Sequence, residues 1–224
     1  SAPVVDHNGV LLGRITIDDI VDVIEEETSE DFYRLAGTDV EEIVYGDNIG
    51  KIARIRLPWL LTNLFGGLLT GYLMWLFKHT ITDAIALIAF IPVITGMGGN
   101  LGLQSSTISV RGLAIGKITL HNFKHHLFKE IKVALVVATV CGSTVGIIAF
   151  LWHKQPTLGL MVGLAMFCAM SMAVLMGTIM PILLRKLGVD PAVASGPFVT
   201  TANDITGILI YMTIATLLLN YLRG

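Results

Sequence analysis

The sequence predicts an all-α membrane protein with five transmembrane helices and a short α/β segment at its N-terminus. Of the 224 residues, 54% are hydrophobic and the mean hydropathy is +0.74, which is more apolar than a typical soluble domain. Five long runs lack charged side chains, apart from a single acid in the last of them. Each run reaches the roughly 20 residues that an α-helix needs to cross the hydrocarbon core.

We expect the spans at about residues 57–77, 84–110, 133–153, 156–184 and 197–221, within a membrane domain of residues 55–224. In lipid, a helix satisfies its own backbone hydrogen bonds. Because five is odd, the termini lie on opposite sides of the cell (inner) membrane. Basic residues concentrate on the cytoplasmic side, so a cytoplasmic N-terminus and an external C-terminus are expected. This choice places three basic residues outside (Lys78, Lys154, Arg223) and ten inside: Lys51, Arg54, Arg56, Arg111, Lys117, Lys124, Lys129, Lys132, Arg185 and Lys186.

Charge divides the chain into two regions. Residues 1–47 hold 13 of the 17 acidic residues against only Arg14 and Arg34, a net charge of −11, whereas residues 48–224 carry +9. Such asymmetry indicates two regions in different surroundings. We find no nucleophile–base arrangement, phosphate-binding loop or nucleic-acid-binding patch, so we expect neither an enzyme nor a nucleic-acid-binding protein.

The acidic segment predicts a strand, a turn at Asn8-Gly9, a second strand and an amphipathic helix with apolar residues at helical spacing. An acid-rich helix is often simply a solvated face. The alternative is a sensor of divalent cations, since hard cations prefer oxygen ligands and would relieve the repulsion among the acids. The candidate ligands are Asp6, Asp18, Asp19, Asp22, Glu26 and Asp31.

Two spans contain unusual amounts of glycine and proline. The second includes "IPVITGMGGNLGLQSS" and the fifth opens with "DPAVASGPFVTTAND". Irregular backbone at membrane depth is tolerated where it lines a cavity, and it often marks the substrate site of a transporter. We therefore expect broken helices whose carbonyl groups face an ion. The alternative is close helix packing through small residues.

Asp204 is the acid inside the fifth span, and ionisable residues within membrane helices are costly and usually functional. Thr200 lies four residues earlier, on the same helical face, and Asn100 and Gln104 form a similar pair in the second span. Mg²⁺ keeps several waters and is usually held through one or two carboxylates. In a two-fold dimer, two copies of Asp204 would face one path. The alternatives are a helix–helix hydrogen bond, a buried pair with a base, or a proton relay.

Residues 111–132 are expected to form a basic cytoplasmic loop. The loop contains His121, His125 and His126, of which His121 and His125 have the i, i+4 spacing of a pair of zinc ligands. A zinc site is possible there, but the sequence shows no third ligand to complete it.

The chain resembles the MgtE family of magnesium transport proteins. The resemblance rests on "GMGGNLGLQSST", on "MPILLRKLGVDPAVASGPFVTTANDITG", and on an N-terminal segment ("PVVD", "GVLLGRIT", "DDIVDVI") similar to the closing half of a CBS module. It implies a homodimeric Mg²⁺ channel in membrane lipids, closed by Mg²⁺ bound to cytoplasmic acidic sites. Mg²⁺ is then both transported and regulatory. By position, Asp204 matches the family's pore aspartate, and Asn100 and Thr200 line the pore through water.

The resemblance also divides the chain into a CBS half (1–28), an acidic linker with a connecting helix (29–54) and the pore domain (55–224). Because only part of the family's sensor is matched, we expect a pore that opens more readily than that of the longer proteins. Two other functions stay open: a proton- or sodium-coupled secondary transporter of divalent cations, and a membrane-anchored regulatory protein that binds nucleotide.

Overall fold

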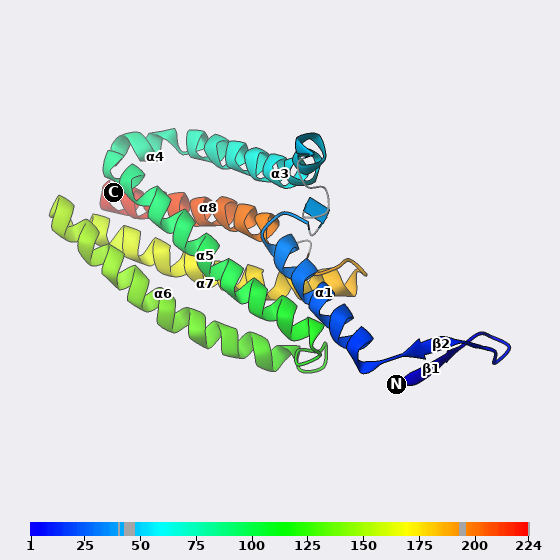
Figure 1. Ribbon diagram of the computed structural model, residues 1–224. Helices are drawn as coiled ribbons and strands as arrows, with labels where there is room; N and C mark the ends of the chain where they lie inside the picture. The colour runs from blue at the N-terminus through cyan, green and yellow to red at the C-terminus, as the bar shows by residue number, and fades with distance from the viewer. Residues whose placement is uncertain (40, 43–47, 193–195, 224) are drawn as a thin grey trace.

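A computed structural model of the chain describes residues 1–39, 41–42, 48–192 and 196–223 (Figure 1). It is mostly helical, and five of its helices in the described residues are long and apolar enough to cross a membrane, as predicted. The elements are β1 (Ala2–Val5), β2 (Leu11–Ile15), α1 (Ile17–Leu35), α3 (Ile49–Leu76), α4 (Lys78–Asp83), the 3₁₀ helix η1 (Ile85–Phe90), α5 (Ile91–Ala114), α6 (Phe123–His153), α7 (Pro156–Lys186) and α8 (Pro197–Arg223).

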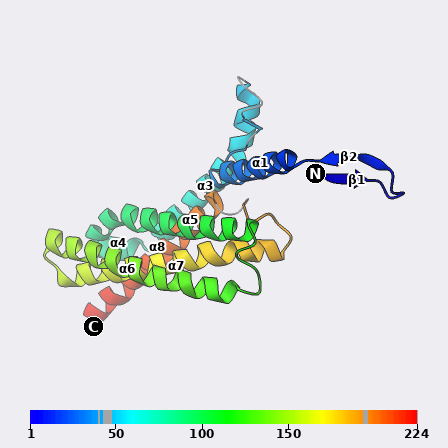
Figure 2. The same cartoon turned by 60° about the horizontal axis from the view of Figure 1, so that its bottom comes forward.

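The N-terminal segment has the expected order of strand, turn, strand and helix. Strands β1 and β2 pair antiparallel, and Gly9 makes the turn with a positive φ of 80°. Thr16 and Asp19 form a capping box that starts α1. The hairpin projects away from the helices (Figures 1 and 2).

The acidic linker and connecting helix expected at residues 29–54 are described only in part. Helix α1 crosses the boundary expected at residue 28 and ends at Leu35, followed by Gly37 with a φ of 78°. The next long helix, α3, begins at Ile49 and continues without a break into the first span. Within residues 29–54 the structure thus describes the end of α1, the turn at Gly37 and the start of α3.

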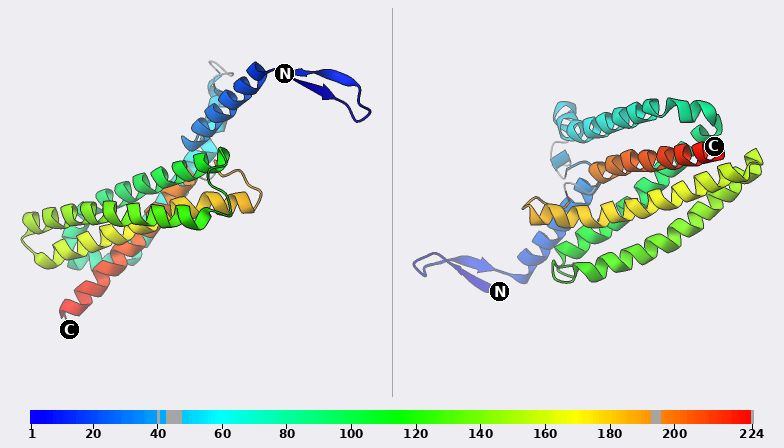
Figure 3. Two further views of the ribbon diagram at one scale, coloured as in Figure 1. Left: turned by 90° about the horizontal axis from the view of Figure 1, so that it is seen from below. Right: turned by 180° about the vertical axis from the view of Figure 1, so that it is seen from behind.

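Helix α7 is the centre of the bundle. It packs against α5, α6 and α8, and it is the most buried of the five spans. Helix α3 lies along α8 on the opposite side of the bundle from α6, and it is the least buried span (Figures 1 and 3). The hairpin and the C-terminus lie at opposite ends of the bundle (Figure 1), as an odd number of spans requires.

The second span is not broken at its glycines, where the sequence predicted a break. Helix α5 runs without interruption through Gly96, Gly98, Gly99 and Gly102, and the 3₁₀ break precedes it at η1. The glycines instead permit close helix contacts, because a Cβ on Gly102 would overlap the Asn203 amide of α8. Helix α8 is also regular from Pro197 onward, although residues 193–195 before it lie outside the described part.

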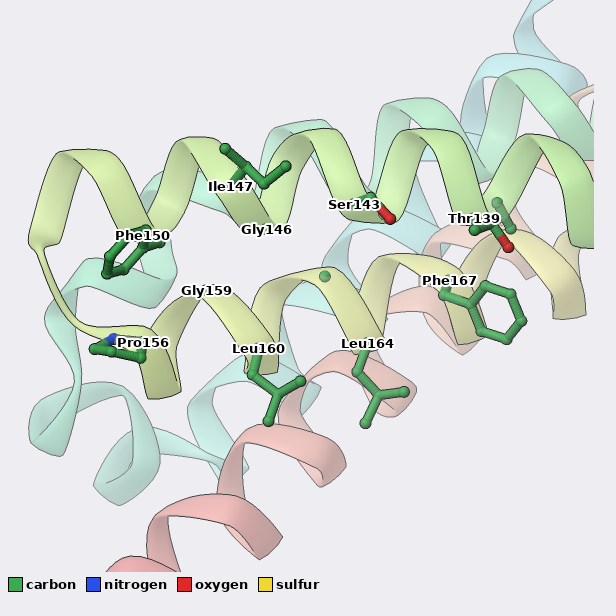
Figure 4. Close-up of a pocket in the computed structure, with 13 residues that line it drawn as sticks. Thr139, Ser143, Gly146, Ile147, Phe150, Pro156, Gly159, Leu160, Leu164 and Phe167 are labelled. Carbon is green, nitrogen blue, oxygen red and sulfur yellow. The ribbon is translucent and has the colours of Figure 1, made fainter.

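Glycines also bring α6 and α7 together. A Cβ on Gly142 would lie 2.8 Å from the Gly163 carbonyl oxygen, and one on Gly146 would lie 2.8 Å from that of Gly159. This close crossing leaves an apolar groove of about 740 Å³, whose walls include Phe150, Pro156, Leu160 and Phe167 (Figure 4). Small residues at such crossings let helix backbones approach in lipid.

Near the C-terminus, two polar contacts join α8 to η1 and to α4. The hydroxyl of Tyr211 on α8 donates to the Leu87 carbonyl oxygen of η1 at 2.8 Å, and both residues are fully buried. The hydroxyls of Thr80 and Thr216 lie 2.7 Å apart. The first contact satisfies a carbonyl that the 3₁₀ break would otherwise leave unpaired.

Candidate ion-binding site

The site is built on the first turns of α8. Proline is well suited to a helix start, where its missing N–H is not needed, and α8 begins at Pro197. The backbone N–H and the hydroxyl of Thr200 both donate to the Gly196 carbonyl oxygen, each at 3.2 Å. The Thr200 hydroxyl oxygen keeps its acceptor capacity, and Asp204 follows one turn later on the same face.

Gly99 of α5 lies against this face of α8. A Cβ placed on Gly99 would be 3.5 Å from Thr200 Cγ2 and 4.0 Å from Asp204 Oδ1. The structure therefore brings the glycine-rich motif of the second span beside the carboxylate of the fifth. Because glycine has no side chain, this contact leaves space and offers the carboxylate no side-chain hydrogen-bond donor.

The Asp204 carboxylate is half-buried between helices. Within the described residues it has no hydrogen bond and no ion pair, whereas other carboxylates such as Asp19 and Glu42 do. This excludes, for the described residues, both the helix–helix hydrogen bond and the buried pair with a base that the sequence left open. A half-buried carboxylate without a partner is energetically costly.

The other predicted residues of the second span lie beside this contact, but they point elsewhere. Asn100 follows Gly99 directly and is exposed, and Gln104 is exposed one turn further along α5. Exposed amides in the middle of a helix that crosses a membrane need water or protein around them. Tyr211, seven residues after Asp204 on α8, is fully buried in the core.

The residues between Thr200 and Asp204 contact other helices. Thr201 donates to the Asn63 side-chain oxygen of α3 at 2.9 Å, and it packs tightly on Gly66. Asn203 packs on Gly102 with only 2% of its surface exposed, and neither polar atom of its amide has a hydrogen-bond partner in the described part of the chain. Helix α8 thus contacts α3 through Thr201 and α5 through Asn203. The side chains of Thr200 and Asp204 face Gly99.

Sequence reasoning missed a second buried acid, Glu130. The basic loop ends earlier than expected, because α6 already begins at Phe123. Glu130 is only 5% exposed and accepts a hydrogen bond from the Ser105 hydroxyl of α5 at 3.0 Å. Its i, i+4 spacing with Ala134, Ala138 and Gly142, all buried, is the signal that could have placed it in the bundle.

The six acids predicted to bind a regulatory cation lie along the hairpin and α1. Asp6 accepts backbone N–H groups from its own turn, and Asp19 caps α1, which lowers the pKa of both carboxyls. Asp18, Asp22 and Glu26 follow at i, i+4 spacing on an exposed face of α1. The side chain of Asp31 lies outside the described residues. In the described part of the chain no three His, Cys, Asp or Glu residues gather into a metal site.

Two ion-pair groups tie the N-terminal segment to the membrane helices. Arg34, near the end of α1, contacts both Glu30 and Asp190, the latter in the loop after α7. Glu42 accepts two hydrogen bonds from Arg56 of α3, at 2.6 and 2.7 Å. The Arg56 hydrogen bonds, and then that from Thr38, lower the pKa of Glu42 to about 2.

The arrangement suits the binding of a hydrated cation rather than covalent chemistry. Asp204 supplies one negative charge, and Thr200 supplies a neighbouring oxygen. A single carboxylate is too few ligands for a fully dehydrated Ca²⁺ but is typical of Mg²⁺, which retains water.

Comparison with known proteins identifies the family of this chain. A family model described as MgtE, divalent cation transporter, matches residues 91–214, which include Gly99 and Asp204. The chain is 43% identical over 221 residues to "Magnesium transporter MgtE" of Enterococcus faecalis, covering 99% of this chain and 48% of that protein. The proteins of the same name from Bacillus subtilis and Thermus thermophilus are each 38% identical, over 96% and 97% of this chain and 47% and 48% of theirs.

The chain spans about half the length of the relatives it matches. The matches to these relatives cover the spans and the N-terminal segment together. With five candidate spans, this chain is a multi-pass membrane protein that belongs to the MgtE family of divalent cation transporters.

Proposed function

We propose that two copies of this chain form a Mg²⁺ channel in the cell membrane, with Asp204 of each copy facing the ion path. The single observation that carries the proposal is the half-buried Asp204 carboxylate, which has no hydrogen-bond or ion-pair partner among the described residues and lies against Gly99. An ionisable group within a membrane span needs a counterpart. A passing cation supplies that counterpart.

The choice of Mg²⁺ follows from the sparse ligand set. Mg²⁺ releases its waters reluctantly and is usually bound through one or two carboxylates. The Asp204 carboxylates would hold the hydrated ion, while Thr200 and Asn100 would contact its waters. The name of the related proteins, magnesium transporter, supports the same ion.

Exposed polar residues support the dimer. Asn100 and Gln104 are exposed on α5, one of the membrane helices, on the stretch that also carries Gly99. Lipid would leave these amides without partners, whereas a second copy would enclose them around water. Two-fold symmetry is the commonest arrangement of homo-oligomers, and it would bring two Asp204 carboxylates to one axis.

We also propose that cytoplasmic Mg²⁺ regulates the channel through the acidic segment. Support comes from the net charge of −11 in residues 1–47 and from the exposed row of Asp18, Asp22 and Glu26. The ion pairs of Arg34 connect α1 to the loop before α8. A cation bound near α1 could therefore affect the start of the helix that carries Asp204.

Mg²⁺ uptake into proteoliposomes at fixed voltage tests the pore. We expect Asp204→Asn and Asp204→Ala to abolish uptake while the dimer stays intact on sizing, because both remove the charge. Glu25→Gln is the matched control, since Glu25 is an exposed acid on α1, and it should leave uptake unchanged. Parental uptake in both Asp204 variants would refute the proposal.

The same vesicles separate a channel from a coupled transporter. A channel follows voltage and the Mg²⁺ gradient alone. Uptake that follows an imposed pH or Na⁺ gradient at fixed voltage would instead favour the proton- or sodium-coupled secondary transporter.

A further inference from the structure

Four polar side chains join α5 to α6, away from the proposed ion path. The Ser105 hydroxyl donates to Glu130 Oε2 at 3.0 Å, and Ser109 Oγ lies 3.1 Å from His126 Nε2. Ser105, Ser109 and Glu130 are buried, and His126 is half-buried. We call these four residues the α5–α6 clamp.

The buried position of Glu130 is destabilising for the protein. It is 5% exposed within a helix that crosses the membrane, and no basic residue in the described part of the chain forms an ion pair with it. Burial of an ionisable group without an ion-pair partner is energetically costly. Ala134 and Ala138 continue the same buried face, so an apolar residue would fill this place at lower cost.

The clamp acts on the helix that contacts Asp204. Gly99 lies six residues before Ser105, or about 9 Å along the helix axis, and its backbone lies beside Thr200 and Asp204. Helix α5 is therefore held from α6 by hydrogen bonds and touches the site on α8 through a glycine. A rotation of α5 about its axis would change the distance between Gly99 and the carboxylate.

We propose that Glu130 and Ser105 are positioning residues for ion passage. Their hydrogen bond holds α5 in the rotation that keeps Gly99 beside Asp204, and neither residue touches the ion. The proposal rests on the proposed function, because it assumes that ions pass Asp204. What Ser105 requires from α6 is an oxygen acceptor, and the negative charge of Glu130 is not needed for this role.

Conservative and disruptive variants distinguish this role from that of a charged site. Glu130→Gln keeps an oxygen acceptor of similar size, whereas Glu130→Ala and Ser105→Ala each remove one side of the bond. We expect the two alanine variants to lower Mg²⁺ uptake roughly three- to thirtyfold and to change the ratio of Mg²⁺ to Mn²⁺ uptake. Glu130→Gln should retain at least half of the parental uptake and the parental ratio.

A double variant and a neighbouring serine complete the experiment. Residues that act through one shared bond are not additive, so Ser105→Ala with Glu130→Ala should lose no more than the worse single variant. The control is Ser106→Ala on the same helix, because Ser106 is also buried but its hydroxyl has no partner in the described residues. It should keep parental uptake. If Glu130→Ala does not fold, Ser105→Ala, which removes one oxygen atom, carries the test.

Two outcomes would overturn the positioning role. Glu130→Gln as impaired as Glu130→Ala would mean that the carboxylate charge itself is used. Parental uptake and ion ratio in both alanine variants would mean that the clamp does not affect the ion path. Failure of the proposed function gives a different result, since Asp204→Asn would then keep its uptake in the same vesicles.

Discussion

A close backbone approach between α5 and α7 predicts a strong effect of Gly177→Ala. A Cβ on Gly177 of α7 would overlap the Gly102 carbonyl oxygen of α5 and would lie 3.0 Å from the Gly102 carbonyl carbon. These are backbone atoms, so no rotamer change can relieve the clash. Since carbon atoms prefer separations of 3.5–4.0 Å, α5 would have to withdraw by roughly 0.5–1 Å.

The size of the effect follows from two opposing terms. Overpacking typically costs about 1–3 kcal/mol, and the better helix propensity of alanine returns up to about 1 kcal/mol. We expect a net loss of about 1–2 kcal/mol, or roughly 2–8 °C in unfolding temperature by the scaling for soluble proteins of this length. Mg²⁺ uptake should also fall, because the displaced helix carries Gly99 beside Asp204.

Thermal unfolding in detergent and proteoliposome uptake measure both effects. Gly71→Ala on α3 is the matched control, since a Cβ there has nothing within 4 Å; its stability should be unchanged or slightly higher. An unfolding temperature and an uptake equal to those of the parent in Gly177→Ala would refute the claim that α5 and α7 touch through their backbones.

Two further predictions concern the ends of the bundle. Tyr211→Phe removes the donor to the buried Leu87 carbonyl, so thermal unfolding should show a loss of about 1–2 kcal/mol in the free energy of unfolding. The same change at exposed Tyr72 is the control and should leave stability unchanged. Equal effects of the two changes would contradict the prediction. The Arg56 hydrogen bonds lower the pKa of Glu42 to about 2. The stabilisation that they give is therefore fully present above the unfolded-state pKa of about 4.3. It is lost as the pH falls toward 2, where the folded carboxylate is protonated. The stability difference between the parent and Glu42→Gln should therefore shrink over that range of pH, and a constant difference would contradict the assignment.

Local sequence patterns were sufficient for the elements themselves. Long uncharged runs located all five spans, because crossing a membrane sets a minimum length and excludes most charges. The hairpin turn was also predicted correctly, since Asn8-Gly9 suits a tight turn between two strands.

The errors came from features that depend on distant contacts. The glycines of the second span suggested a broken helix on propensities measured in water, but in lipid an unpaired backbone group costs more than the weak propensity of glycine. The purpose of Gly102 depends on Asn203, about 100 residues away. Glu130 was assigned to a loop because it is charged, and its partner Ser105 is on another helix.

The short run "TTAND" of α8 links these local and distant effects. Successive residues of a helix are rotated by about 100°, so the polar side chains of this run meet different neighbours. Thr201 bonds to Asn63 of α3, and Asn203 packs on Gly102 of α5. Asp204 and Thr200 face Gly99, which has no side chain to donate a hydrogen bond. A neighbour with a donor would have turned the carboxylate into a packing contact, whereas glycine leaves its oxygens available to an ion.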